Sequence, residues 1–349
     1  MPMLRRASFA GLKVETTAGT DVVPTAGSNA VVLYDAEIHP LSESTSVDRE
    51  PYSGNLSQES PVPGMMAGTF TCKTYVSGSG TAPASAATAP PWGVALIGCG
   101  FKQTVTASTS VTYAPVSTYS TAGSWSPTAT YAGMEPLSIY VWNNDTTGAA
   151  AGKLYKLLGA MGNAKFSFKT GEPATIAMDF KGVYSAPTVV SFPAPTFTAH
   201  QQPKPILAAG CTFTPSGGAA HTMVFRSLEI DMGMEVILRS DGNNASGFTS
   251  ALIVNRKPTA KLQVEEPASY TPAAGQNWWT NFSSGVVGDL EIGTIGSTAG
   301  NIYAIDMPKV GFKKVDMSTA DGIRVIDIDM QLATNAISTG DDEFTLTFT

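Results

Sequence analysis

The chain carries one series of short segments twice, in the same order, and this repeat limits the folds that it can adopt. Asp35-Ala-Glu-Ile in the first half matches Ser227-Leu-Glu-Ile in the second. The pairs that follow are Ser46–Arg49 with Val236–Arg239, Gly68–Lys73 with Pro258–Gln263, Leu137–Ile139 with Leu290–Ile292, Gly152–Tyr155 with Gly300–Tyr303, and Gly171–Phe180 with Asp321–Ile328. A repeat kept in order over the chain indicates two similar domains.

The composition indicates that both domains are mainly β-structure. Charged residues make up only 14% of the 349 residues, against about 25% in an ordinary soluble domain. The chain holds 34 glycines and 23 prolines, which is a turn-rich composition, and 43% of its residues are hydrophobic. Segments such as Gly68–Val76 alternate between apolar and polar residues, as half-buried strands do. We therefore expect two similar β-sandwich domains, each with a short flanking helix.

A stretch with five prolines, residues 185–205, makes the best boundary between the two domains. We expect an N-terminal arm at 1–30, a first β-domain at 31–184, a proline-rich linker and connecting hairpin at 185–224, and a second β-domain at 225–349. Within the first domain, residues 41–68 form a long polar loop and residues 102–136 an inserted β-arm.

Two tryptophans mark the expected helices. Pro91 lies at the start of the candidate helix Pro91–Cys99 and Gly100 follows its end. Trp92 in this helix and Trp278 in its counterpart are the candidate core anchors. After the insertion, the sequence predicts strands near Lys153–Leu158, Ala164–Phe168 and Ala174–Tyr184.

The sequence holds no pattern that indicates catalysis, a bound cofactor or a metal. Cys72, Cys99 and Cys211 are too widely spaced for a zinc or redox motif. None of the three histidines has a histidine or cysteine at ligand spacing. We therefore expect a protein that is not an enzyme, with buried free thiols.

Four acids recur at strand positions that we expect to face water. Asp327 and Asp329 are two residues apart and share one face of a strand. Such a pair could serve as a general acid and base or hold a cation, but apolar residues alternate with it and favour a solvated face. Asp179 and Glu229 have the same alternating setting.

The net charge of −7 and the lack of a long basic run indicate that the protein does not grip nucleic acid. The basic N-terminus lacks the apolar run of a signal peptide. No apolar stretch is long enough to span a membrane, so we expect no membrane partner.

Several passages together resemble the major tail tube proteins of long, flexible-tailed bacteriophages. The resemblance covers nearly the whole chain, and its individual motifs are short. They are Lys13–Asp21 with Pro24-Thr25, Val47–Arg49, Trp92–Phe101, Tyr113–Pro115, Gly171–Ala174 through Phe180–Tyr184, Gly233–Arg239, Asn255–Pro258 and Thr339–Phe348.

The resemblance implies a structural role in the virion tail, after synthesis in the host cytoplasm. The inner sheets of such proteins join into a closed β-barrel ring, and stacked rings form the conduit for DNA ejection. Two tube domains per chain imply three subunits in a pseudo-six-fold ring. The implied partners are further copies of the chain, the tail tip, tape-measure and tail-terminator proteins, and double-stranded DNA that passes without specific binding. Asp179, Glu229, Asp327 and Asp329 become candidate lumen-facing acids.

Two other interpretations remain open at the level of sequence. The chain could be a receptor- or carbohydrate-binding β-sandwich of a virion or cell surface, with Tyr119, Trp125 and Tyr131 stacking on sugars. It could also be a hydrolase on a β-scaffold, although no nucleophile with a partnering base is evident.

Overall fold

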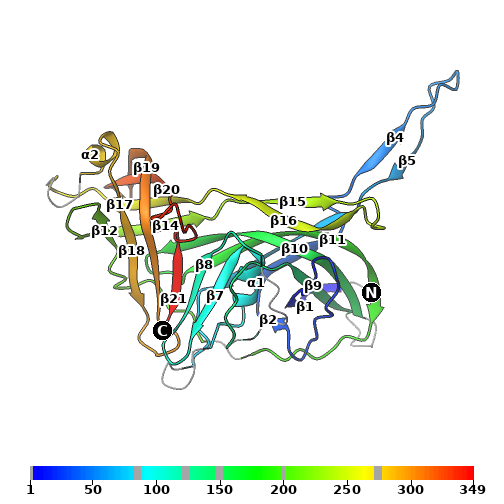
Figure 1. Ribbon diagram of the computed structural model, residues 1–349, viewed down its shortest axis with the longest axis horizontal. Coiled ribbons are helices and arrows are strands. Elements are labelled where there is room, and N and C mark those ends of the chain that lie inside the picture. Colours follow the sequence, from blue (N-terminus) through cyan, green and yellow to red (C-terminus); the bar gives the residue numbers. More distant parts are fainter. Residues whose placement is uncertain are drawn as a thin grey trace.

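A computed structural model describes residues 3–81, 88–119, 126, 128–145, 152–198, 201–270 and 277–349. The described residues are mainly β-structure, as the composition predicts, and nearly all strand pairings are antiparallel. Figure 1 shows the strands of both halves of the chain forming one continuous arrangement, from which a single hairpin projects.

Eight strands lie side by side across both halves of the chain, and we call them the eight-strand run. In spatial order they are β3 (Tyr34–His39), β6 (Ala67–Tyr75), β11 (Thr175–Val190), β10 (Gly152–Lys169), β14 (Phe225–Asp231), β17 (Thr259–Glu265), β20 (Ile323–Leu332) and β19 (Tyr303–Ala320). The first four belong to the first half and the last four to the second. The junction between the halves is the pairing of β10 with β14.

The pairings of the second half repeat those of the first. In the first half, β3, β6, β11 and β10 pair in that order and β10 also pairs with β9 (Leu137–Asp145). In the second half, β14, β17, β20 and β19 pair in that order and β19 also pairs with β18 (Val287–Ile295). The pairings therefore follow the order of the segments that repeat in the sequence.

Seven further strands belong to the same sheet system as the eight-strand run. They are β1 (Met3–Val14), β2 (Ala30–Val31), β7 (Phe101–Thr106), β8 (Ser110–Pro115), β12 (Thr212–Pro215), β13 (His221–Thr222) and β21 (Thr345–Phe348). The last of these, β21, pairs with β19 on one side and with β8 on the other. The C-terminal strand thus ties the second half to the first.

Strand alternation places the core on one face of the eight-strand run. In β11, Ile176, Met178 and Phe180 are buried, whereas Asp179 between them is exposed. One cluster of buried side chains extends from the first half into the second. The run therefore has a core face and a polar face.

The two predicted helices are present and short. α1 (Gly93–Gly98) is buried along its whole length and is followed by Gly100, whose φ of 80° suits the left-handed end of a helix. α2 (Trp278–Ser283) starts after Asn277, whose side chain accepts a hydrogen bond from the Thr280 N–H.

The structure corrects three expectations about the first half. The arm at 1–30 contains β1, a long strand that pairs with β9 and buries Leu12 and Val14. The strands expected at Lys153–Leu158 and Ala164–Phe168 are one strand, β10. A bulge near Gly159, whose φ is 56°, interrupts the alternation there, so the sequence pattern of this one strand resembles that of two.

The third correction concerns the long polar loop at 41–68. It contains a hairpin of β4 (Ser46–Arg49) and β5 (Glu59–Pro63). All the residues of these strands are exposed, so they lack the alternation of apolar and polar residues that marks a half-buried strand. The insertion at 102–136 does hold a hairpin, formed by β7 and β8.

The segment after β1 is held to the bulge of β10 by a buried acid. Glu15 is 1% exposed, and its carboxylate accepts hydrogen bonds from the N–H groups of Gly159 (2.8 Å) and Gly19 (2.6 Å) and from the Ser138 hydroxyl (2.8 Å). Burial nevertheless raises the pKa of Glu15 from 4.5 to about 7.

We expect the protein to lose stability as pH rises from about 4.5 to 7. The folded carboxyl of Glu15 holds a proton through this window while the unfolded one has released it, and a shift of this size corresponds to roughly 3 kcal/mol. Glu15→Gln should flatten the slope, as measured by urea denaturation at a series of pH values. Part of the slope should remain, because burial beside Asp289 also raises the pKa of Asp306. Equal slopes for variant and wild type would contradict this account.

Candidate assembly interface

The four acids predicted to face water lie on the polar face of the eight-strand run. Asp179 and Glu229 are exposed, and Asp327 and Asp329 are partly exposed. Their strand neighbours on the core face, such as Met178, are buried. Strand periodicity alone therefore found the orientation of these four side chains.

Lysines lie between these acids, and the alternation in the sequence did not predict them. Glu229, Lys261, Asp329 and Lys314 lie next to one another on four neighbouring strands. Lys165 Nζ lies 3.6 Å from a carboxylate oxygen of Asp231 and 4.0 Å from one of Asp179. The polar face thus carries interleaved charges of both signs, because strand register, which the sequence does not state, sets which residues are neighbours.

The register also corrects the alignment of the two halves near these acids. Asp179 pairs with Thr71 on β6, and Asp329 pairs with Lys261, which the repeat places at the position of Thr71. Asp329 is therefore the counterpart of Asp179, whereas the sequence match that ends at Phe180 and Ile328 aligns Asp179 with Asp327. Bulges in β10 and β19 account for such shifts, because each adds a residue to one strand only.

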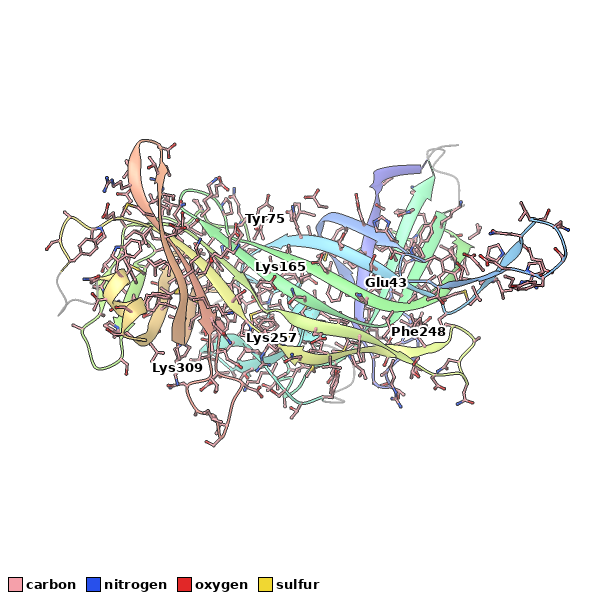
Figure 2. The ribbon with its side chains drawn as sticks, turned by 90° about the horizontal axis from the view of Figure 1, so that it is seen from above. Glu43, Tyr75, Lys165, Phe248, Lys257 and Lys309 are labelled. Atoms are coloured by element: carbon pink, nitrogen blue, oxygen red, sulfur yellow. The ribbon has the colours of Figure 1, made fainter. Side chains whose placement is uncertain are left out.

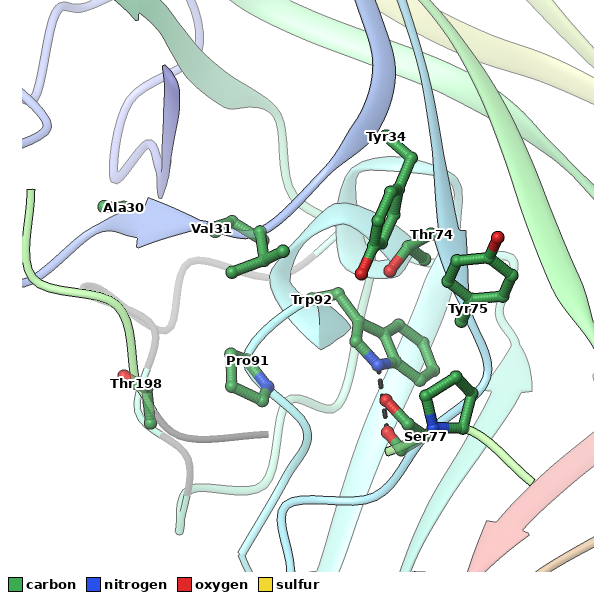
Figure 3. A pocket seen from close by; sticks show the side chains of 11 residues that line it. Ala30, Val31, Tyr34, Thr74, Tyr75, Ser77, Pro91, Trp92 and Thr198 are labelled. Carbon is green, nitrogen blue, oxygen red and sulfur yellow. Dashed lines mark hydrogen bonds between the residues drawn. The ribbon is translucent and has the colours of Figure 1, made fainter. Parts of the chain in front are cut away.

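Both anchor tryptophans are buried, one directly before α1 and the other at the start of α2. Trp92 directly precedes α1, and its indole N–H donates to the Ser77 carbonyl at 3.0 Å. Trp278 opens α2 and packs against the rings of Phe213 and Phe312. Figure 3 shows Trp92 beside Tyr75 and Ser77 in a cavity of about 20 Å³, which has room for about one water molecule.

The described part of the chain shows no arrangement suited to chemistry at a metal or thiol. It contains no group of three or more histidine, cysteine or acidic side chains placed to hold a metal ion. Cys72, Cys99 and Cys211 are buried free thiols, and burial raises the pKa of Cys211 to about 12. A thiol held neutral in this way is a poor nucleophile.

The junction between the halves is a closed, apolar contact between two sheet edges. At the pairing of β10 with β14, Phe166 lies opposite Ile230 and Phe168 opposite Leu228, and all four are buried. On the polar face of this junction Lys165 lies opposite Asp231. The strands of the two halves therefore form one continuous sheet across this junction, with packed apolar side chains on the core face and oppositely charged side chains on the polar face.

Both ends of the eight-strand run remain open. Among the described residues, β3 pairs only with β6, and β19 from Phe312 to Ala320 pairs only with β20. Open edges present unpaired backbone donors and acceptors, which are ready to pair with another chain.

The open edges repeat the two sides of the closed junction. By the repeat and the observed registers, Met317 on β19 takes the position of Phe166, and Ile38 on β3 takes that of Ile230. Phe166 is 1% exposed, whereas Met317 is 42% exposed and Ile38 is partly exposed. These apolar side chains lack the neighbour that covers their counterparts.

No protein-family model matches the chain, and a search of curated proteins returned no significant match. In the ranges that the structure describes, no helix is long and apolar enough to cross a membrane.

Proposed function

We propose that this protein is a non-enzymatic structural subunit that assembles with copies of itself into closed rings, and that stacked rings form the tail tube of a long-tailed bacteriophage. One observation carries the proposal. The chain joins its two halves edge to edge through β10 and β14, and it repeats both sides of that junction as open edges at β19 and β3.

The closed junction supplies the register of the proposed contact between copies. Phe166 lies opposite Ile230 within the chain, so Met317 lies opposite Ile38 of the next copy. Lys165 lies opposite Asp231, so Asp316 lies opposite His39 of the next copy. The acid therefore faces a lysine at the junction within the chain and a histidine at the junction between copies, with the two sides exchanged.

Repetition of the same junction closes the sheet into a ring and removes its edges. Because one chain supplies two similar four-strand units, three chains give a ring with pseudo-six-fold symmetry. A repeated head-to-tail contact gives a ring when its rotation closes and an open filament when it does not. The sequence resemblance to tail tube proteins supports this arrangement over an open filament.

The polar face of the run suits the wall of a DNA conduit. We place Asp179, Glu229, Asp327 and Asp329 on the lumen side, together with Lys165, Lys261 and Lys314. Tight binding to DNA requires several cations that contact phosphates together. Interleaved acids break up such a cationic track, so double-stranded DNA passes without being held. The tail tip, tape-measure and tail-terminator proteins are the partners that this role requires.

The carbohydrate-binding alternative receives little support from the aromatic residues that suggested it. Tyr131 is 1% exposed, so its ring is not available to a sugar. Tyr119 is 46% exposed, and its hydroxyl accepts a hydrogen bond from the Ile253 N–H at 2.9 Å, which fixes the ring against the strand Phe248–Arg256. Trp125 lies outside the described residues.

A cysteine pair tests the proposed register and the number of subunits together. Ile38→Cys and Met317→Cys in one chain should oxidise to disulfides between copies, because directly opposite residues in antiparallel strands lie within bridging distance. A non-reducing gel should show dimers and trimers, and the ladder should end at the trimer. The three native cysteines are buried and should not interfere.

The matched control combines Glu37→Cys with Met317→Cys. A shift of one residue puts the two thiols on opposite faces of the sheet, so this pair should not cross-link. Equal cross-linking of the two pairs would overturn the register, and a ladder that continues to six would overturn the three-subunit ring. Negative-stain electron microscopy of the wild type should show rings or tubes with a central hole.

A further inference from the structure

The chain contains two hairpins that occupy the same place in the repeat. The β4–β5 hairpin lies between β3 and β6, and the hairpin of β15 (Met234–Ser240) and β16 (Phe248–Arg256) lies between β14 and β17. Their turns contain Gly54, with a φ of 75°, and Gly247, with a φ of 78°. They are therefore counterparts in the two halves.

The β15–β16 hairpin lies over the other half of its own chain. Phe248 and Leu238 pack against Ala67 and Val183 of the first half. A Cβ atom added to Gly159 would lie 2.7 Å from Cβ of Ser250. Ala67, Val183 and Leu158 form one row across β6, β11 and β10, Gly159 follows Leu158 in the bulge of β10, and the hairpin covers this end of the sheet.

The β4–β5 hairpin has no such surface beneath it. It projects away from the rest of the molecule in Figure 1, and all residues of both its strands are exposed. Val47 and Val62 lie opposite each other and are 60% and 45% exposed. In the β15–β16 hairpin, the apolar residues Leu238 and Ala251 also lie opposite each other, but they pack against the first half.

The second half contains a row at the corresponding position, here called the uncovered row, in which Lys257 is exposed and Ala333 and Lys309 are partly exposed. The N–H of Ala333 donates to the carbonyl of Lys309 at 2.9 Å, and the N–H of Leu332 donates to the carbonyl of Pro258. Because Pro258 lies opposite Leu332, Lys257 lies opposite Ala333. Lys257, Ala333 and Lys309 thus correspond to Ala67, Val183 and Leu158. Figure 2 shows Lys257 near the middle of the molecule and Lys309 toward the end away from the β4–β5 hairpin, which points in the opposite direction. The hairpin of the same chain therefore does not reach them.

The charges of the uncovered row and of the free hairpin are opposite. The segment 40–68 contains Glu43, Asp48, Glu50 and Glu59 against one arginine, Arg49. Glu43 forms an ion pair with Lys181 at 3.1 Å, and Glu59 forms one with Arg49 at 2.8 Å. Asp48 and Glu50 are the acids nearest the turn, and neither belongs to these two ion pairs. The row offers Lys257 and Lys309, with Lys313 nearby on β19.

We propose that the β4–β5 hairpin of one copy lies across Lys257, Ala333 and Lys309 of a second copy, as a charged latch over the junction of β19 with β3. The inference rests on the proposed ring, since the ring brings the first half of one copy beside the second half of the next. The two kinds of junction then differ in the chemistry of their cover. The junction inside the chain is covered by apolar contacts, whereas the junction between copies is covered by ion pairs.

This difference makes the junction between copies selectively sensitive to salt. Ion pairs at a surface weaken as salt screens them, and apolar packing does not. The halves of one chain therefore stay joined under conditions in which copies separate.

Charge reversal on each side, followed by combination, tests the latch. Lys257→Glu with Lys309→Glu reverses the row, and Asp48→Lys with Glu50→Lys reverses the hairpin. Sedimentation velocity over a series of protein and NaCl concentrations measures assembly. We expect each double variant to need about tenfold more protein to assemble, and the quadruple variant to recover toward the wild type. Glu235→Lys with Glu291→Lys, outside both surfaces, is the control for net charge.

The outcomes separate the latch from the ring. If the reversed variants assemble like the wild type, or if the quadruple variant is no better than either double variant, the latch is wrong. The disulfide between the cysteines introduced by Ile38→Cys and Met317→Cys should still form in every variant at high protein concentration, because it reports the β19–β3 junction alone. If this pair fails to cross-link in an otherwise wild-type chain, the ring is wrong, and the latch with it.

Discussion

We expect Met317→Lys to yield a folded protein that does not assemble. Met317 is at the open edge of β19 and is 42% exposed in the single chain, so a lysine there reaches water at little cost. In the proposed ring, that side chain would take the position that the buried Phe166 has at the junction within the chain, and it would lie against Ile38 of the next copy. A buried unpaired ammonium costs several kcal/mol. Assembly should therefore require at least about 100-fold more protein.

Two controls keep this result interpretable. Met317→Leu preserves the apolar contact and should assemble at wild-type concentrations. Ile337→Lys adds the same charge at a site that is 90% exposed and lies in neither β3 nor β19, and it should also assemble. Sedimentation velocity measures the assembled fraction, and circular dichroism checks the fold. Rings formed by Met317→Lys at the wild-type concentration would rule out β19 as an assembly edge.

We expect Asp327→Lys combined with Asp329→Lys to raise the affinity of the polar face for double-stranded DNA. The change leaves Lys261 and Lys314 beside two new lysines, without the acids that now separate them. Neutralisation of phosphates releases counterions, so the acquired affinity should fall steeply as salt rises. Fluorescence anisotropy with a double-stranded oligonucleotide at several salt concentrations would measure it, and the wild type should bind weakly throughout.

The same change in net charge outside the eight-strand run provides the comparison. Glu235→Lys with Glu291→Lys lies on β15 and β18 and should add little DNA affinity. If both double variants gained equal affinity, net charge alone would explain the effect and the polar face would have no special role. Both variants should form rings, because none of the four residues lies at an open edge.

The sequence by itself determined the class of fold and the local direction of many side chains. Low charge, frequent turns and alternation predicted strands, and alternation placed Asp179, Glu229, Asp327 and Asp329 toward water. Proline before and glycine after an apolar segment located α1. These features depend on residues that are close along the chain, so composition and periodicity suffice to find them.

Only the tertiary structure decided which strands are neighbours and which edges stay open. The pairing of β10 with β14 joins residues far apart in the sequence, and the bulges in β10 and β19 shift the register by amounts that no local pattern reveals. That register places Lys165 between Asp179 and Asp231 and makes Asp329 the counterpart of Asp179. It also explains why Phe166 is buried while Met317 is exposed, since burial depends on the strand alongside and not on the residue's own sequence neighbours.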